Sequence, residues 1–390
     1  MWWAVAIVLG LSAGCTSTEP DDGTTGPVPS VASSPPASGP PASTGTTATG
    51  TTGAGTTGPR TTATGTTTTG TSGDGSSGTA EPTGTVVTFR TVAPGSAAGI
   101  RIGIVASSGS DPFSAAVADS VVDQVEAAGA ELIRCDPGAN ASLALDCARR
   151  LATQHVDGWI SLPPALVGEA LCAAGPQDAP LITVAAAPVS CQRAQVGADD
   201  RRAGFLTGQA LGRSARLRAG CQHDVLVVIT GDPADPASAR RTEGILDGVA
   251  GECPASGADP VLLDAATQDR AYEAFTNELT ALPDDTEVLV AAVDDGTALG
   301  AAAAVPAARA DRITLAAVGA DQRARCRIVA EPWWIGDAAL FPDRYGEVVV
   351  PALLDAIAGT DVPADMYVET AFVTADSLAT FYDLGDCPVR

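Results

Sequence analysis

Residues that could perform catalysis are few and widely separated in this chain. Its 390 residues contain two histidines, His155 and His223, and neither falls in an arrangement that forms a Ser-His-acid triad. The adjacent carboxylates Asp294 and Asp295 would point to opposite sides of an extended segment, unlike the two acids of a glycosidase. There is also no phosphate-binding loop and no metal-ligand spacing. We therefore predict no enzymatic activity, no cofactor and no bound metal.

The cysteines carry the other reactive groups. Apart from Cys15 there are eight, with no C-x-x-C pair, so disulfides are favoured over zinc and an oxidising compartment is indicated. Closeness in the sequence pairs Cys135 with Cys147 and Cys221 with Cys253. The four cysteines whose pairing stays open are Cys172, Cys191, Cys326 and Cys387.

Strands alternate with helices from about residue 98 onward. The first helix opens at Asp111 and Pro112, a good N-cap followed by a residue suited to the first helical position. The expected strands are residues 102–106, 131–134, 156–162, 180–185, 224–230, 261–264, 288–292 and 313–318. The expected later helices are residues 143–154, 165–174, 202–213, 238–250, 271–281 and 297–304. This alternation, in two series that meet near residues 195–198, predicts two doubly wound parallel-sheet domains.

In open parallel sheets a ligand lies beyond the carboxyl ends of the strands. Two sheets with facing ends would enclose a cleft. The segments that would border it are residues 107–113, 161–164, 186–190, 231–238, 268–270, 294–295 and 321.

The N-terminal part has a different composition. Residues 1–14 form an uncharged apolar run, too short to span a bilayer, and Leu-Ser-Ala-Gly before Cys15 resembles a bacterial lipobox. Residues 16–97 are almost entirely Thr, Gly, Ser, Pro and Ala, which predicts a flexible tether without a core. We expect lipidation at Cys15 and a location on the outer face of the cell membrane. The alternative is an ordinary secretory signal followed by an incidental cysteine.

The formal charge is −24, from 46 acidic and 22 basic residues, all of the latter arginine. The sequence has no basic stripe, so we predict that nucleic acid is not a partner.

Seven segments between about residues 98 and 385 carry a family resemblance. In order they read GIVASSGSDPFSAAVADSVVDQVEAAGAELI, VDGWISLPP, VGADDRRAGFLTGQAL, VVITGDPADPASARRTEGI, LVAAVDDGTALGAAAAV, ITLAAVGAD and FPDRYGEVVVPALLDAIAG. Together they resemble the type 1 periplasmic binding proteins, in particular the ribose/galactose-type sugar-binding branch. No DNA-binding headpiece precedes them, which disfavours the repressors that share this fold.

The resemblance implies an α/β fold of two doubly wound parallel-sheet lobes joined by three crossovers. The crossings would fall near Asp199 and Asp200, near Leu340 and within residues 366–374. The expected domains are a signal peptide (1–14), a tether (15–97), an N-terminal lobe (98–200 and 340–366) and a C-terminal lobe (201–339 and 367–390).

The resemblance also implies ligand-binding residues. Phe113 stands where the family has a stacking aromatic, the alternative being a core phenylalanine, and Asp111 either contacts ligand or caps a helix. Asp294 and Asp321 occupy positions typical of acceptors for sugar hydroxyls, with helix capping as the alternative for each. The other candidates are Arg240 and Arg241, between which the register does not decide, Gln268, and the stacking or hinge-packing residues Trp333 and Trp334.

Two departures from the family pattern fall in the first lobe. Ala185 to Ala187 replace an expected Asp-Arg pair, and Ser161 or Leu162 replaces an expected asparagine. This lobe therefore offers fewer hydrogen-bonding groups than a monosaccharide site requires.

These features predict a monomeric, extracytoplasmic, lipid-anchored solute-binding protein that passes a sugar-like molecule to an ABC permease. The alternative is a ligand-sensing or surface interaction module on a long stalk that no longer serves transport.

Overall fold

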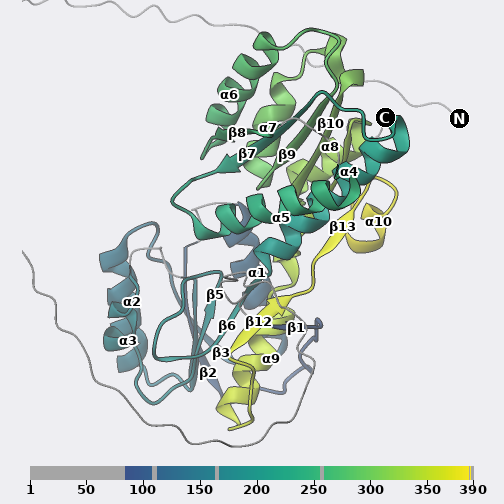
Figure 1. The fold of residues 1–390 in the computed structure, drawn as a ribbon. Helices are drawn as coiled ribbons and strands as arrows, with labels where there is room; N and C mark the ends of the chain where they lie inside the picture. The colour runs from purple at the N-terminus through teal and green to yellow at the C-terminus, as the bar shows by residue number, and fades with distance from the viewer. Residues whose placement is uncertain (1–83, 108–111, 163–166, 255–258, 386, 388–390) are drawn as a thin grey trace, which may run out of the picture. The chain divides into compact units, whose positions relative to one another are not determined.

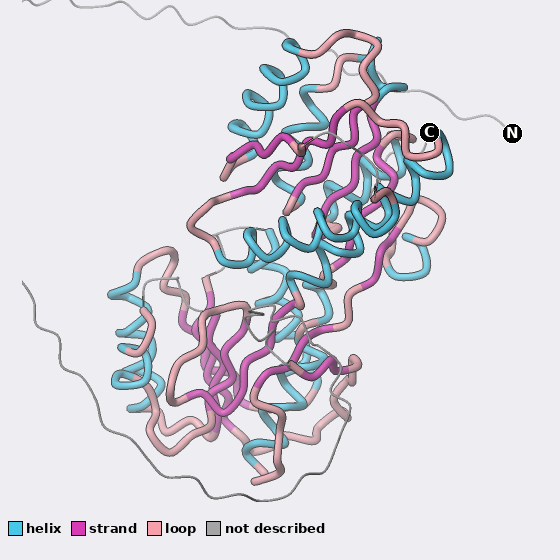
Figure 2. Tube along the Cα trace, viewed as in Figure 1, coloured by secondary structure: helices cyan, strands magenta, loops and turns pink. Residues whose placement is uncertain are grey.

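Two α/β lobes are formed by the residues that this computed structural model describes, which are 84–107, 112–162, 167–254, 259–385 and 387 (Figures 1 and 2). The expected signal peptide, Cys15, most of the tether and Asp111 lie outside the described residues. No helix among the described residues is long and apolar enough to cross a bilayer.

The first lobe is built on a parallel sheet of seven strands. In sheet order they are β1 (Thr85–Val87), β12 (Asp365–Val368), β6 (Gln192–Ala198), β5 (Leu181–Val184), β4 (Gly158–Leu162), β2 (Arg101–Ala106) and β3 (Glu131–Cys135). One face packs against α1 (Pro112–Ala127) and α9 (Gly346–Ile357), and the other against α2 (Ala141–Thr153) and α3 (Ala170–Ala174). Both faces of the central strands are apolar because both are covered.

The second lobe is built on a six-stranded sheet, parallel except for its last strand. In sheet order the strands are β13 (Ala371–Val373), β11 (Trp334–Ala339), β10 (Ile313–Gly319), β9 (Val288–Ala292), β7 (Val225–Gly231) and β8 (Val261–Asp264). One face packs against α6 (Gln268–Ala281), α7 (Asp295–Ala304), α8 (Gln322–Ala330) and α10 (Leu378–Phe381), and the other against α4 (Asp200–Ala219) and α5 (Pro236–Glu252). The short 3₁₀ helix η1 (Ala307–Arg312) precedes β10, and a second one, η2 (Pro342–Arg344), lies between β11 and α9 and contacts α1 and α9 of the first lobe.

The chain changes sheet three times. It passes from β6 into α4 at Asp199, from β11 through η2 to α9, and from β12 to β13. The predicted fold of two parallel-sheet lobes joined by three crossovers is confirmed. The first sheet keeps the chain as far as Val368 and β13 begins at Ala371, so the third change of sheet falls within the predicted residues 366–374, two residues after the predicted lobe boundary at 366.

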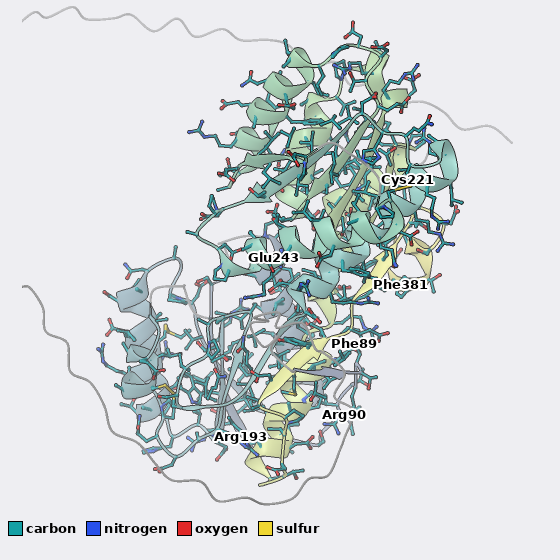
Figure 3. All side chains as sticks on the ribbon, viewed as in Figure 1. Phe89, Arg90, Arg193, Cys221, Glu243 and Phe381 are labelled. Atoms are coloured by element: carbon teal, nitrogen blue, oxygen red, sulfur yellow. A yellow bond between two sulfur atoms is a disulfide. The ribbon has the colours of Figure 1, made fainter. Side chains whose placement is uncertain are left out.

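The tether is shorter than predicted, because residues 84–97 belong to the folded part. β1 pairs in parallel with β12, and the ring of Phe89 packs against the apolar cores of both lobes. Arg344 lies over that ring at 3.8 Å from its centroid, and Arg90 forms an ion pair with Asp355 at 2.6 Å. Figure 3 labels Phe89 and Arg90 beside the yellow C-terminal segments. Composition misled here because a few apolar residues that pack against the first core, Val87, Phe89 and Val92, suffice to fasten the segment to an existing sheet edge.

Four disulfides staple the lobes, two in each. The predicted pairs Cys135–Cys147 and Cys221–Cys253 are confirmed. The pairs that the sequence left open are Cys172–Cys191 and Cys326–Cys387.

The predicted helices and strands are present, with notable differences in the lengths of two helices. α4 spans 20 residues, Asp200–Ala219, instead of the predicted 202–213. α3 spans five residues, Ala170–Ala174, instead of the predicted 165–174, and residues 163–166 lie outside the described part.

Candidate ligand-binding site

The carboxyl edge of the second sheet concentrates acidic side chains on one tight turn. Between β10 and α8 the backbone passes through Gly319 (φ 138) and Ala320 (φ 67) before Asp321. The Asp295 carboxylate lies against this turn and accepts hydrogen bonds from the N–H groups of Ala320 at 2.9 Å and Asp321 at 2.8 Å. Any side chain at position 319 would collide with that carboxylate, so only glycine fits there.

The two predicted sugar acceptors cap helices. Asp321 Oδ1 accepts from the N–H of Ala324 at 2.9 Å, and Asp294 Oδ1 accepts from the N–H of Thr297 at 2.8 Å. Asp321 Oδ2 pairs with Arg323 at 3.0 Å, and its side chain is 14% exposed. Capping thus occupies one oxygen of each carboxylate. Capping and contact with a ligand through the second oxygen are compatible roles.

Arg240 and Arg241 do not compete for one role, since both hold Asp200. Their guanidinium groups reach the two oxygens of that carboxylate at 2.9 Å each, and Arg241 also donates to the carbonyl of Val293 at 3.0 Å. α4 and α5 bring these residues together because their backbones approach closely at Gly204, where a Cβ atom would collide with the carbonyl of Arg241. One positive charge therefore remains over the strand end that carries Asp294.

Of the remaining candidates, Gln268 is exposed near Asp321, whereas Trp334 is buried in the core. Gln268 is exposed at the start of α6, and its side-chain oxygen accepts from Arg323 at 3.4 Å, which places it near Asp321. Trp334 is fully buried in the second core, so it packs rather than stacks on a ligand, and Trp333 packs partly buried against the same core.

A buried acid that sequence reasoning missed lies beneath this edge. Asp337, in the middle of β11, is fully buried, and its Oδ1 accepts from the indole N–H of Trp334 at 2.7 Å and from the N–H of Ala317 at 2.9 Å. Burial raises the pKa of Asp337 to about 6, with hydrogen bonds from Trp334, Ala317 and Asp295 acting in the opposite direction. Burial, followed by the charges of Asp337 and Asp321, also holds the pKa of Asp295 well above its ordinary value. The only signal in the sequence was an acid inside the apolar run Trp334–Ala339.

At the corresponding edge of the first sheet, the ends of β4 and β5 carry the residues that depart from the family pattern. Ser161 is completely buried at the end of β4, and its hydroxyl has no hydrogen-bond partner in the described part of the chain. Ala185 takes a left-handed conformation (φ 49), and the carbonyl of Ala186 accepts from Gln195 at 2.7 Å. Neither Ala185 nor Ala186 has a polar side chain, so at these two positions the first lobe offers a ligand only backbone groups.

Phe113 joins the first lobe to the crossover region. Its ring meets Tyr345 edge-on at 5.7 Å between centroids and packs half-buried against the group formed by Ala203, Val318, Ala338 and Leu340. This environment favours the packing role over a stacking surface. Asp111, immediately before α1, lies outside the described residues.

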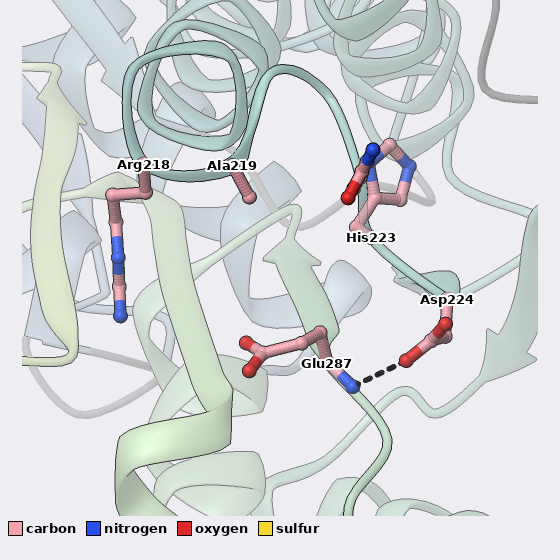
Figure 4. Close-up of a pocket in the computed structure, with 6 residues that line it drawn as sticks. Arg218, Ala219, His223, Asp224 and Glu287 are labelled. Carbon is pink, nitrogen blue, oxygen red and sulfur yellow. Dashed lines mark hydrogen bonds between the residues drawn. The ribbon is translucent and has the colours of Figure 1, made fainter.

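A separate hollow of about 640 Å³ opens at the amino ends of β7 and β9, the opposite edge of the second sheet (Figure 4). Its lining residues are Arg218, Ala219, Gln222, His223, Asp224 and Glu287. Burial lowers the pKa of His223 below its ordinary value, and Asp224 accepts from the N–H of Glu287 at 2.8 Å. In doubly wound sheets ligands bind at the carboxyl edge, so we place the site among the acids described above.

The family model of the periplasmic binding protein domain matches residues 102–361, well over half of the chain. The chain belongs to the periplasmic binding proteins. No match is found among the curated proteins.

Solved structures share the fold of this binding protein. A glucose-galactose binding protein from Geobacillus stearothermophilus matches with a TM-score of 0.59 and 21% identity over 72% of this chain and 98% of the other. A periplasmic ribose ABC transporter protein from Conexibacter woesei matches with a TM-score of 0.62 and 18% identity over 73% and 95%. An ABC transporter solute-binding protein from Mycobacterium smegmatis, with bound glycerol, matches with a TM-score of 0.59 and 21% identity over 72% of this chain and 96% of the other. At these identities the likeness establishes the type 1 fold.

Proposed function

We propose that this binding protein is an extracytoplasmic lipoprotein that captures a small, sugar-like molecule and passes it to an ABC importer. The proposal is supported by the family and by structural neighbours whose names describe the binding of glucose, galactose, ribose and glycerol. It includes lipidation of Cys15, a monomeric folded part and no catalytic step.

The proposal of a hydroxyl-bearing ligand rests on two partly exposed carboxylates at the ends of adjacent strands. Asp294 follows β9 and Asp321 follows β10, and these strands pair directly in the sheet. The oxygen that does not cap, which in Asp321 also pairs with Arg323, can accept hydrogen bonds from ligand hydroxyls, and such charged bonds are worth about 1.5 to 3 kcal/mol each.

The charge at this edge narrows the ligand further. Asp200 already neutralises one of the two charges of Arg240 and Arg241, while Asp294 and Asp321 lie at the ends of the neighbouring strands β9 and β10. An anionic ligand would meet these acids with little compensation. We therefore propose a neutral or weakly cationic polyhydroxylated ligand.

Thermal unfolding of the disulfide-bonded chain in the presence of sugars, polyols and amines tests the proposal. A ligand at about 100 times its Kd stabilises the native state by about 2.7 kcal/mol, which corresponds to an upward shift of about 5 °C. The expected result is such a shift with at least one sugar or polyol and none with sugar acids.

The second candidate function, a sensing or surface interaction module, is favoured by the apolar edge of the first sheet around Ser161 and Ala185. A sensing or interaction module that binds none of these compounds would show no shift of its unfolding temperature with any sugar, polyol or amine. That result would contradict the transport proposal. Membrane attachment is tested separately: Cys15→Ser is expected to release the chain from the membrane fraction without changing its unfolding temperature.

A further inference from the structure

Residues 84–92 are fastened to three elements of the first lobe. β1 pairs in parallel with β12 (Figure 1). The N–H of Arg90 donates to the carbonyl of Glu347 in α9 at 2.9 Å. The N–H of Val92 donates to the side-chain oxygen of Gln124 in α1 at 3.1 Å. Backbone hydrogen bonds therefore fix the path of this segment along the first lobe.

Phe89 carries the segment to the second lobe. Its ring packs against the apolar cores of both lobes, and it meets the buried ring of Phe341, in the second core, edge-on at 5.9 Å between centroids. The guanidinium group of Arg344 lies over the face of the Phe89 ring at 3.8 Å from its centroid, and an ion pair with Glu347 at 2.8 Å holds it there. Edge-on ring pairs and cations over aromatic faces are both attractive contacts. One side chain thus joins elements of both lobes.

The two partners of Phe89 lie at opposite ends of the second crossover. Phe341 follows β11 of the second sheet, and Arg344 is the last residue of η2, from which the chain enters α9 of the first lobe. Phe341 takes a left-handed conformation (φ 48), which is costly for a bulky residue and persists only where the surrounding contacts hold it. The Phe89 ring contacts both ends of this crossover and so bridges it.

The same segment borders the third crossover. Val87 pairs with Val368, the last residue of β12, and β13 of the second sheet begins three residues later at Ala371. Two of the three connections between the lobes therefore lie beside residues 84–92. Turning one lobe against the other changes the backbone angles at such connections.

We propose that residues 84–92 form a hinge strap that restricts this turning, with Phe89 as the side chain that couples the two lobes. A strap fixed to the first lobe and packed against the second resists any rotation that would separate the rings of Phe89 and Phe341. The consequence for ligand capture rests on the proposed function, because it assumes that the lobes close on a ligand, but the restraint itself does not.

Two amides at the second crossover report on the restraint without any ligand. The N–H of Leu340 donates to the Gly319 carbonyl at 3.1 Å. The N–H of Arg344 donates to the Phe341 carbonyl at 2.9 Å. These hydrogen bonds open when the crossover flexes, so the exchange of their hydrogens with solvent measures how firmly it is held.

Hydrogen exchange of the whole, disulfide-bonded chain, followed by mass spectrometry at labelling times of seconds to minutes, tests the hinge strap. In Phe89→Ala we expect residues 340–345 to exchange about tenfold faster than in the parent chain, because the bridging contacts are lost. β2 and β9 should stay protected at these labelling times, because their central positions in the sheets open only when a whole lobe unfolds. Phe89→Leu keeps an apolar side chain but removes the aromatic face under Arg344, so it should give a smaller acceleration.

Val87→Ala is the matched control. Val87 belongs to the same segment but packs against the first core, so its truncation should leave the exchange of residues 340–345 unchanged. Unchanged exchange of these residues in Phe89→Ala overturns the hinge strap. An equal acceleration in Val87→Ala overturns the coupling role of Phe89, because the pairing of β1 would then be what holds the crossover.

Faster exchange that extends to β2 and β9 at the same labelling times would show a general loss of stability and would also overturn the hinge strap. Should Phe89→Ala fail to fold, Phe89→Leu decides by the same criteria. Because the measurement uses no ligand, failure of the thermal-shift screen would count only against the proposed function.

Discussion

The carboxyl edges of the two sheets share a backbone design but differ in chemistry. In the second lobe, Asp294, Asp295 and Asp321 follow neighbouring strands and engage in caps and turns. In the first lobe, the ends of β4 and β5 present Ser161, whose hydroxyl is buried without a partner among the described residues, and Ala185. A parallel sheet fixes where a ligand can lie, whereas the residues one or two positions past each strand decide whether it is held. The comparison supports the proposal that polar recognition belongs to the second lobe.

The largest expected difference between the two lobes is in how much stability each loses when a disulfide is removed. Cys326–Cys387 closes a loop of 61 residues in the second lobe, and Cys135–Cys147 a loop of 12 in the first. In the chain-entropy model, replacing both cysteines by serine costs about 4 kcal/mol for the longer loop and about 3 kcal/mol for the shorter one. Urea unfolding of the two double variants measures the difference. A larger loss in the first-lobe variant would show that native-state contacts, not loop length, set the order.

Phe89 is expected to affect both lobes at once, because its ring packs against both cores and lies under Arg344. Phe89→Ala removes this half-buried ring and its cation–π contact, so the free energy of unfolding should fall by about 2 kcal/mol. Phe381→Ala is the matched control, since that ring also meets Phe341, at 5.5 Å, but is 41% exposed. Equal losses in the two variants would argue against a fastening role for residues 84–97.

Asp321→Ala is the sharpest test of the second lobe as the site of recognition. With any ligand found by thermal shift, its Kd should rise at least tenfold, because a charged acceptor of hydroxyl bonds is lost. Loss of the cap costs about 1 kcal/mol of stability, so Asp321→Asn, which keeps a capping oxygen, separates the two roles by calorimetric titration. Unchanged affinity in Asp321→Ala would reduce Asp321 to a capping residue and remove the basis for preferring the second lobe.

The smallest effect is expected in the first lobe. The Ser161 hydroxyl is buried without a partner, so Ser161→Ala should stabilise the fold by about 1 kcal/mol and change ligand affinity less than twofold. Thermal unfolding with and without ligand measures both quantities. A tenfold loss of affinity would reveal that Ser161 contacts ligand and that the first lobe recognises polar groups after all.

The fold was predictable from the sequence because it follows from local patterns. Apolar runs such as residues 288–292 and 313–318 alternate with helices that carry their own N-caps, and a covered parallel sheet is the arrangement that buries both faces of such strands. The two sequence-local disulfides followed from spacing for the same reason. The lack of side-chain hydrogen-bonding groups at residues 185–187 could also be read from the sequence, because alanine has none in any surroundings.

Only the tertiary structure decided the contacts between residues that are distant in the chain. The sequence could not show that residues 84–97 add a strand beside β12, since Val86 and Val87 gain a partner only when residues 365–368 are in place. It treated Arg240 and Arg241 as rivals, whereas the close approach of α4 and α5 gives both to Asp200. It missed the Asp295 and Asp337 pair entirely, because the pKa of a carboxyl is set by burial and by neighbouring charges, and these exist only once β10, β11 and α7 have packed together.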